Sequence, residues 1–151
     1  MTPTGGLVLL DTSILIHLLR ATALGSQVAD EHSLKRRSDR PLLSIVTVGE
    51  ALAFARKRGW GAPKVTKLRE LIHQLVIVDI HSTEVLEHYA TLDAFCEAQG
   101  KALGKNDLWI AATAAVTGAL LLTTDKDFDP LHQEKLLRRV WYDPAASREN
   151  P

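Results

Sequence analysis

Cysteine is almost absent from this chain of 151 residues, which contains only Cys96. One thiol cannot close an intrachain disulfide, so the disulfide-stabilised scaffolds of small secreted domains are excluded. A chain of this length buries roughly two thirds of its unfolded surface, and one ordinary hydrophobic core is enough to stabilise it. We therefore expect one domain over residues 1–143, a flexible C-terminal tail at 144–151, and a reducing, cytoplasmic environment.

Long apolar runs are missing as well. No segment approaches the roughly 18 apolar residues that a membrane-spanning helix needs. Residues 1–6 carry no basic side chain, which argues against a secretory signal peptide. The hydrophobic fraction of 46% and the charged fraction of 24% are typical of a globular domain. We expect no membrane association.

An excess of one charge is also absent, because 18 basic and 18 acidic residues give a net charge of zero. This balance argues against a protein that coats nucleic acid nonspecifically. The charges are unevenly placed, however. Residues 30–69 hold ten basic and four acidic residues, for a net +6, and residues 70–100 hold six acidic and no basic residues, for a net −6. A local basic surface can still attract a polyanion.

Short apolar stretches alternate with amphipathic ones along the chain. The predicted strands are Leu7–Leu10, Leu42–Ile45, Leu75–Ile80, Ala119–Thr123 and Arg139–Tyr142. The predicted helices follow Asp11, span about Thr47–Arg58, Lys64–Gln74, Ser82–Gln99 and Asn106–Thr117, and include part of Thr22–Arg40. Strands that alternate with helices favour right-handed parallel units. The sequence predicts an α/β fold with a central parallel sheet of about four or five strands and helices on both faces.

Acidic residues follow several of these predicted strands. Asp11 ends the first strand, and Asp125 and Asp127 follow the fourth. Glu50 stands three residues after Thr47, the spacing of a helix capping box, and is expected in the first turn of its helix. Asp107 is expected in the first turn of the alanine-rich helix. Taken singly, each of these acids also fits a helix cap or a solvated turn.

Taken together, these acids favour a metal site. The carboxyl ends of parallel strands meet at one edge of a sheet, where ligand sites usually form. Carboxylates without histidine or cysteine suit a hard cation such as Mg²⁺ or Mn²⁺. The histidines show no metal-ligand spacing and no glycine-rich phosphate loop is present. We therefore expect the acids to converge.

Four segments resemble the PIN-domain ribonucleases, most closely the VapC type, which are toxins of bacterial toxin–antitoxin pairs. The segments are Leu9–Ser13, Ser44–Glu50, Lys105–Ala112 and Leu122–Phe128. Their order and spacing match the family over roughly residues 7–142. The last two segments, with the sequences KNDLWIAA and LTTDKDF, are the specific ones in tandem.

The resemblance implies a catalytic and metal-binding quartet, Asp11, Glu50, Asp107 and Asp125, with Asp127 as an additional or substitute ligand. It implies that Thr12 or Ser13, and also Thr123, orient these carboxylates, although Thr12 and Ser13 serve equally well as helix caps.

The resemblance also implies an activity and partners. These are hydrolysis of RNA with Mg²⁺ or Mn²⁺ to a 5′-phosphate and a 3′-hydroxyl, a homodimer, and a cognate antitoxin that inserts a basic side chain into the acidic pocket.

Basic residues supply the candidates for contact with RNA. Lys101 and Lys105 flank Asp107, and a basic run comprises Lys35, Arg36 and Arg37. A second run, residues 56–58, precedes Trp60 and offers phosphate contacts and a base-stacking ring. A solvated charged face is the alternative for both runs, and burial or a partner contact is the alternative for Trp60.

Other functions remain open at the level of sequence. A non-toxin housekeeping PIN nuclease and a non-catalytic PIN module that binds RNA or protein share the same fold. A binding module has no need for mutually repelling acids. An aspartyl-phosphate phosphatase of the haloacid dehalogenase type would also place an aspartate after a strand. That chemistry usually has a second aspartate two residues later, where this chain has Ser13.

Overall fold

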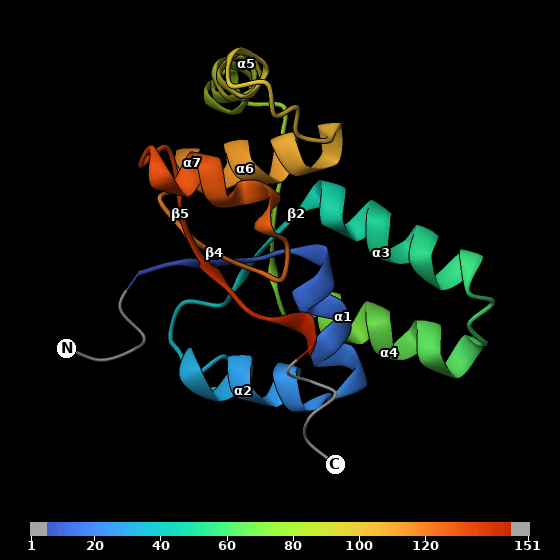
Figure 1. Cartoon of the computed structure of the whole chain (residues 1–151). Coiled ribbons are helices and arrows are strands. Elements are labelled where there is room, and N and C mark those ends of the chain that lie inside the picture. Colours follow the sequence, from blue (N-terminus) through green and yellow to red (C-terminus); the bar gives the residue numbers. More distant parts are fainter. Residues whose placement is uncertain (1–5, 146–151) are drawn as a thin grey trace.

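The computed structural model describes residues 6–145 of the chain. In Figure 1 a parallel sheet crosses the middle of the molecule, with helices above and below it. This arrangement confirms the fold class predicted from the sequence. The tail predicted at 144–151 lies outside the described residues from position 146 onward.

Five short strands make the sheet. They are β1 (Val8–Leu10), β2 (Leu42–Ser44), β3 (Val76–Val78), β4 (Leu120–Thr123) and β5 (Arg138–Trp141). Their order is β3-β2-β1-β4-β5, and every neighbouring pair is parallel. The first strand is therefore central. Its Leu9 pairs with Leu42 on one side and with Leu121 on the other.

Helices connect the strands. They are α1 (Thr12–Arg20), α2 (Ala23–Glu31), α3 (Ile45–Lys57), α4 (Ala62–His73), α5 (Thr83–Ala98), α6 (Lys105–Thr117) and α7 (Asp129–Gln133), with a 3₁₀ turn η1 (Lys126–Phe128). Among residues 6–145 no helix is long and apolar enough to cross a membrane.

Each face of the sheet has its own hydrophobic core. Leu9 and Leu121 point to the face that is covered by α5, α6 and α7. Their strand neighbours Leu10 and Leu122 point to the opposite face, where they pack with residues of α1 to α4. Successive side chains of a strand point to opposite faces, so strands that are apolar at every position stabilise helices on both sides.

The start of α3 corrects a prediction. The predicted capping box of Thr47 and Glu50 is absent because Ser44, the last residue of β2, already caps the helix by accepting a hydrogen bond from the Val46 amide at 3.1 Å. The helix thus begins at Ile45 without an intervening loop. Thr47 is buried within it, and Glu50 lies in its second turn rather than its first.

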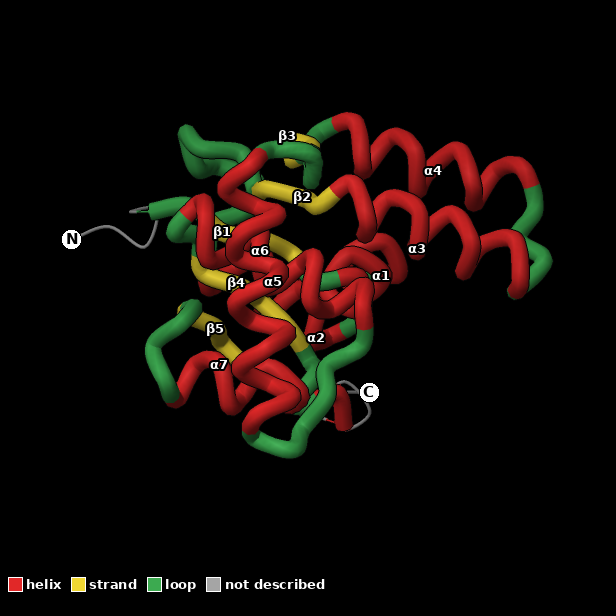
Figure 2. Tube along the Cα trace, turned by 90° about the horizontal axis from the view of Figure 1, so that it is seen from above, coloured by secondary structure: helices red, strands yellow, loops and turns green. Residues whose placement is uncertain are grey.

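The helices α3 and α4 form a hairpin that extends away from the sheet (Figures 1 and 2). It turns at Arg58–Gly61, where Gly59 has a φ of +64° that few other residues adopt without strain. Because α3 starts at the carboxyl end of β2, the hairpin carries its first helix from the edge of the sheet outward.

Candidate active site

Asp11 stands where β1 ends and α1 begins, and it is only 6% exposed. One carboxylate oxygen accepts a hydrogen bond from the Thr12 amide at 2.8 Å, and the other accepts one from the Thr123 hydroxyl at 2.6 Å. Burial raises the pKa of Asp11 to about 6, although both hydrogen bonds lower it. This carboxylate is held rigidly at the carboxyl edge of the sheet.

Glu50 is held at both of its carboxylate oxygens. Oε1 accepts a hydrogen bond from the Thr12 hydroxyl at 2.6 Å, and Oε2 accepts one from the Asn106 amide at 3.1 Å. The Thr12 and Thr47 hydroxyl oxygens are 3.3 Å apart. These contacts join the first turns of α1 and α6 to α3, so three separate helices fix the position of Glu50.

Three further carboxylates complete the group. Asp107 lies in the first turn of α6, and Asp125 and Asp127 follow β4. Each of the three offers a ligand oxygen within 4.8 Å of those of the other two. The turn is ordered by its own bonds, because the Asp125 carboxylate accepts from the Asp127 amide at 2.8 Å and the Thr123 hydroxyl accepts from the Asp125 amide at 2.9 Å.

The five acids form one electrostatic unit, which we call the acid cluster: Asp11, Glu50, Asp107, Asp125 and Asp127. Burial first, and then the negative charges of Asp11, Asp125, Glu50 and Asp127, raise the pKa of Asp107 to about 7. The charge of Asp125, followed by burial, raises the pKa of the exposed Asp127. Like charges at close range disfavour ionisation, and a bound cation relieves that repulsion.

The ligand atoms of the acid cluster fit a hard divalent cation. All of them are carboxylate oxygens, and three lie close enough to share one ion. The charges of Asp11, Glu50 and Asp125 all raise the pKa of Asp107, so the four acids that were predicted to converge do lie near one another. A carboxylate oxygen of Asp127 lies close to oxygens of Asp107 and Asp125. This position suits the additional or substitute ligand that the resemblance implies.

The three hydroxyl residues that were predicted to orient the carboxylates make different contacts. Thr12 and Thr123 make the predicted hydrogen bonds to carboxylates. Ser13 does not, because its buried hydroxyl bonds to no group within the described part of the chain. Two further residues of the site were not predicted. Asn106 bonds Glu50, and its position beside Asp107 was the available signal. Thr47 was interpreted as a cap instead.

The basic candidates lie in two places. Lys105 opens α6 two residues before Asp107, and Lys101 precedes it in the connection from α5; both are exposed. Lys35 and Arg36 are exposed elsewhere, on the segment between α2 and β2. Arg37 is only 7% exposed and donates hydrogen bonds to the carbonyls of His32, at 3.0 Å, and Gly6, so it is engaged within the protein and its contact with RNA stays a prediction.

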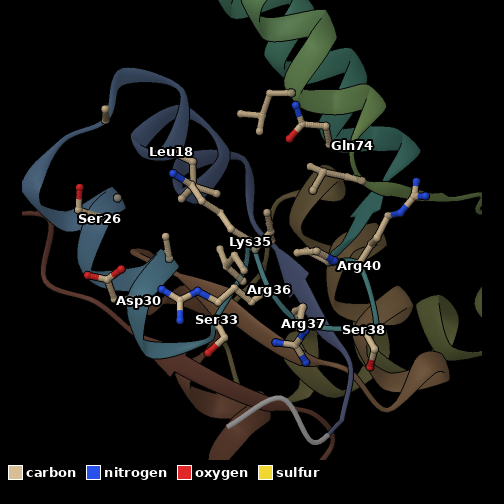
Figure 3. A pocket seen from close by; sticks show the side chains of 18 residues that line it. Leu18, Ser26, Asp30, Ser33, Lys35, Arg36, Arg37, Ser38, Arg40 and Gln74 are labelled. Carbon is tan, nitrogen blue, oxygen red and sulfur yellow. The ribbon is translucent and has the colours of Figure 1, made fainter.

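Lys35 and Arg36 border a cavity of about 850 Å³ (Figure 3). Parts of α1, α2 and α4 line it, and Leu18 and Leu71 contribute apolar surface. Arg40 stands at its edge just before β2 begins, which is the end of that strand opposite the acid cluster. None of the five acids lines this cavity. The basic run of residues 35–37 is therefore separate from the candidate active site.

Comparison with known proteins identifies related sequences. A family model described as PIN domain matches residues 8–132. Ribonuclease VapC1 of Haemophilus influenzae strain R2866 is 29% identical over 118 residues, which cover 76% of this chain and 84% of that protein. Ribonuclease VapC2 of another strain of that species is 25% identical over 117 residues, which cover 78% of this chain and 85% of that protein.

Solved structures agree in fold. The structure of VapBC-1 from nontypeable Haemophilus influenzae matches with a TM-score of 0.73 at 25% identity, covering 89% of this chain and 97% of that one. The structure of VapBC2 from Rickettsia felis bound to a fragment of promoter DNA matches with a TM-score of 0.76 at 23% identity, covering 91% and 99%. At that identity, the second likeness concerns the fold alone.

Proposed function

Because this chain belongs to the PIN domain family, we propose that its acid cluster hydrolyses RNA phosphodiester bonds with the help of Mg²⁺ or Mn²⁺. The observation that carries this proposal is the concentration of five acids at one edge of the sheet, where the pKa of Asp107 rises to about 7. Such repulsion is costly in a purely structural role and useful in a cation site. The curated relatives named Ribonuclease VapC support the same activity.

The proposed roles combine the family resemblance with the contacts of each acid. Asp11 and Asp107 would hold the principal cation, and Asp125 with Asp127 would complete its ligands. A bound divalent cation would offset the charge of the scissile phosphate and lower the pKa of an attacking water. Glu50, fixed at both oxygens by Thr12 and Asn106, orients that water. Lys101 and Lys105 contact a substrate phosphate, and the products carry a 5′-phosphate and a 3′-hydroxyl.

The biological role that we propose is that of the toxin of a type II toxin–antitoxin pair, acting in the cytoplasm. The solved structures that support it include one described as a toxin–antitoxin complex from Klebsiella pneumoniae. In this proposal a cognate antitoxin neutralises the acid cluster with a basic side chain, and the nuclease domain of residues 1–143 assembles as a homodimer.

The metal-dependent activity is tested by cleavage of RNA with purified protein. Wild type should cleave in Mg²⁺ or Mn²⁺ and stop in EDTA, and Asp11→Asn should be inactive in all three conditions. Mapping of the new ends should find 5′-phosphates. Cleavage that continues after chelation, or that survives Asp11→Asn, would contradict the proposed site.

The toxin role needs a separate experiment in cells. Brief induction of wild type should arrest growth and create new RNA ends, while induction of Asp11→Asn should do neither. Co-expression of a neighbouring short reading frame that encodes a DNA-binding protein should restore growth. An active nuclease whose induction leaves growth unchanged would instead be a housekeeping enzyme.

A further inference from the structure

The outer end of the α3–α4 hairpin is strongly basic. Residues 51–69 contain six basic side chains and no acidic one. The six are Arg56, Lys57, Arg58, Lys64, Lys67 and Arg69, and all are exposed. The hairpin extends away from the sheet in both views (Figures 1 and 2), so this charge is presented on a projection.

Three cations lie over two aromatic rings at this end. The Arg58 guanidinium lies 4.8 Å from the centre of the Phe54 ring, and the Lys64 ammonium lies 4.1 Å from the centre of the Trp60 ring. Arg20, from the end of α1, lies 5.6 Å from the Phe54 ring and 5.9 Å from the Trp60 ring. We call these five residues the cation–aromatic cluster. The half-buried rings, which meet edge to face at 5.7 Å, hold the cations in place.

Two helices lead from the acid cluster to the cation–aromatic cluster. On α1, Thr12 bonds Glu50 and Arg20 follows eight residues later. Along α3, Glu50 is followed at intervals of four residues by Phe54 and then by Arg58, the residue that caps the end of the helix. Eight residues of helix span about 12 Å. Arg20 contacts both rings, so the C-terminal ends of α1 and α3 also lie close together.

We infer that the cation–aromatic cluster, with Arg56 and Lys57, binds the sugar–phosphate backbone of RNA beyond the bond that is cut. The inference rests on the proposed function, which supplies RNA at the acid cluster. A polyanion that enters the acid cluster meets repulsion there, so it needs positive charge within reach. The outer end of α3 provides that charge about 12 Å away along the same helix.

The arrangement favours nucleic acid over an acidic protein. The guanidinium groups of Arg20 and Arg58 suit bidentate contact with phosphate. Aromatic rings interleaved with cations are typical of surfaces that follow a single strand. Both α1 and α3 lead from the acid cluster to the cation–aromatic cluster. A surface that binds an unrelated acidic protein would have no reason to lie next to the acid cluster.

The test compares two charge reversals of equal size. Arg58→Glu/Lys64→Glu alters the cation–aromatic cluster, and Lys135→Glu/Arg138→Glu alters two exposed cations near the start of β5. Binding of a fluorescein-labelled single-stranded RNA is measured by anisotropy in EDTA, over a series of salt concentrations. The melting temperature of each variant checks that it is folded, and Arg58→Gln/Lys64→Gln provides a milder change if the reversal does not fold.

We expect the cluster variant to bind roughly tenfold more weakly, and its logarithmic salt slope to flatten by about 0.7 for each phosphate that it no longer neutralises. The control variant should stay within about twofold of wild type. Equal weakening in both variants, or none in either, would overturn the inference. So would a variant that loses binding of a labelled polyglutamate while its RNA binding is unchanged, because the surface would then serve an acidic protein.

The two proposals fail separately in this design. Binding in EDTA does not depend on cleavage. A cluster variant that loses RNA binding supports the inference even if wild type shows no metal-dependent cleavage. Conversely, a variant that keeps its RNA affinity overturns the inference even if wild type is an active nuclease.

Discussion

Two groups of like charge lie near the two ends of α3, and they differ in how far they are buried. The acid cluster near the first half of the helix is partly buried, and the pKa of Asp107 there rises to about 7. The cation–aromatic cluster at the far end is spread over exposed side chains, and rings rather than counter-charges hold it. One group of charges is crowded and partly buried, and the other is exposed to solvent.

This difference in burial shows which group of charges lowers the stability of the fold. Exposed like charges are screened by water and salt, so a basic surface costs the fold little. Acids that are crowded and partly desolvated oppose folding at neutral pH unless a ligand compensates them. Under the proposed function, the acid cluster is the region in which the protein gives up stability for chemistry.

Asp107→Asn should give the largest effect. Loss of a cation ligand should lower RNA cleavage by roughly a thousandfold or more, because metal-ion catalysis contributes several kcal/mol. In EDTA the variant should melt no lower than wild type, since one repelling charge is gone. Mg²⁺ at about 100 times its dissociation constant should stabilise wild type by roughly 2.7 kcal/mol and the variant by much less.

Melting curves with and without metal, beside a cleavage assay, check this prediction. A variant clearly less stable than wild type in EDTA would make Asp107 a structural cap, and the contrast between the two clusters would disappear.

Thr12→Val should give an intermediate effect. The change keeps the shape of the side chain and removes the hydroxyl that bonds Glu50 at 2.6 Å. Loss of a group that orients a functional carboxylate typically costs 10–100-fold, and we expect roughly that reduction in kcat. Thr113→Val is the matched control, because within residues 6–145 the Thr113 hydroxyl bonds only the Trp109 carbonyl of its own helix. Equal reductions in both variants would remove Thr12 from a positioning role.

The pH dependence of stability should give the smallest effect. The pKa values of Asp11 and Asp107, about 6 and about 7, lie above their ordinary value of 3.8. Between about pH 4 and pH 7 the folded state thus binds more protons than the unfolded state, so the free energy of unfolding should fall as pH rises in EDTA. Burial lowers the pKa of His17 and His32 and acts in the opposite direction, so the comparison with a variant is essential.

Urea denaturation at about pH 5 and about pH 8 measures this change. Asp107→Asn should flatten the fall by about 1 kcal/mol, a value that allows for solvent screening. Lys57→Gln, which removes an exposed charge from the basic end of α3, should leave it unaltered. A fall that is identical in all three proteins would show that crowding at the acid cluster is not its cause.

The sequence predicted most of the fold because its signals are local or periodic. Apolar runs identified all five strands within two residues at each end, and the topology of parallel strands brought Asp11, Asp107 and Asp125 to one edge. The cap of α3 was predicted at Thr47 instead of Ser44 for a local reason. Serine, threonine and glutamate all occur near the start of this helix, so the sequence offers several possible capping residues.

The contacts that the sequence did not predict are long-range. Arg37 is part of a basic run that resembles a solvated face, and its burial depends on the carbonyl of Gly6, 31 positions away. The bond from Asn106 to Glu50 likewise spans 56 positions. Nothing in the spacing of single residues reveals such pairs, because the tertiary fold creates them.

The strand order also fixes when the acid cluster can form during synthesis. The central strand β1 is made first, but one of its two partners, β4, comes more than 100 residues later. Asp107 and Asp125 likewise follow Asp11 by 96 and 114 residues. At about 5–20 residues per second, the 114 residues from Asp11 to Asp125 take roughly 6–23 s to synthesise. A nascent chain therefore carries Asp11 for many seconds without the partners that complete the site, and a chain that stops before Asp107 lacks three of the five acids.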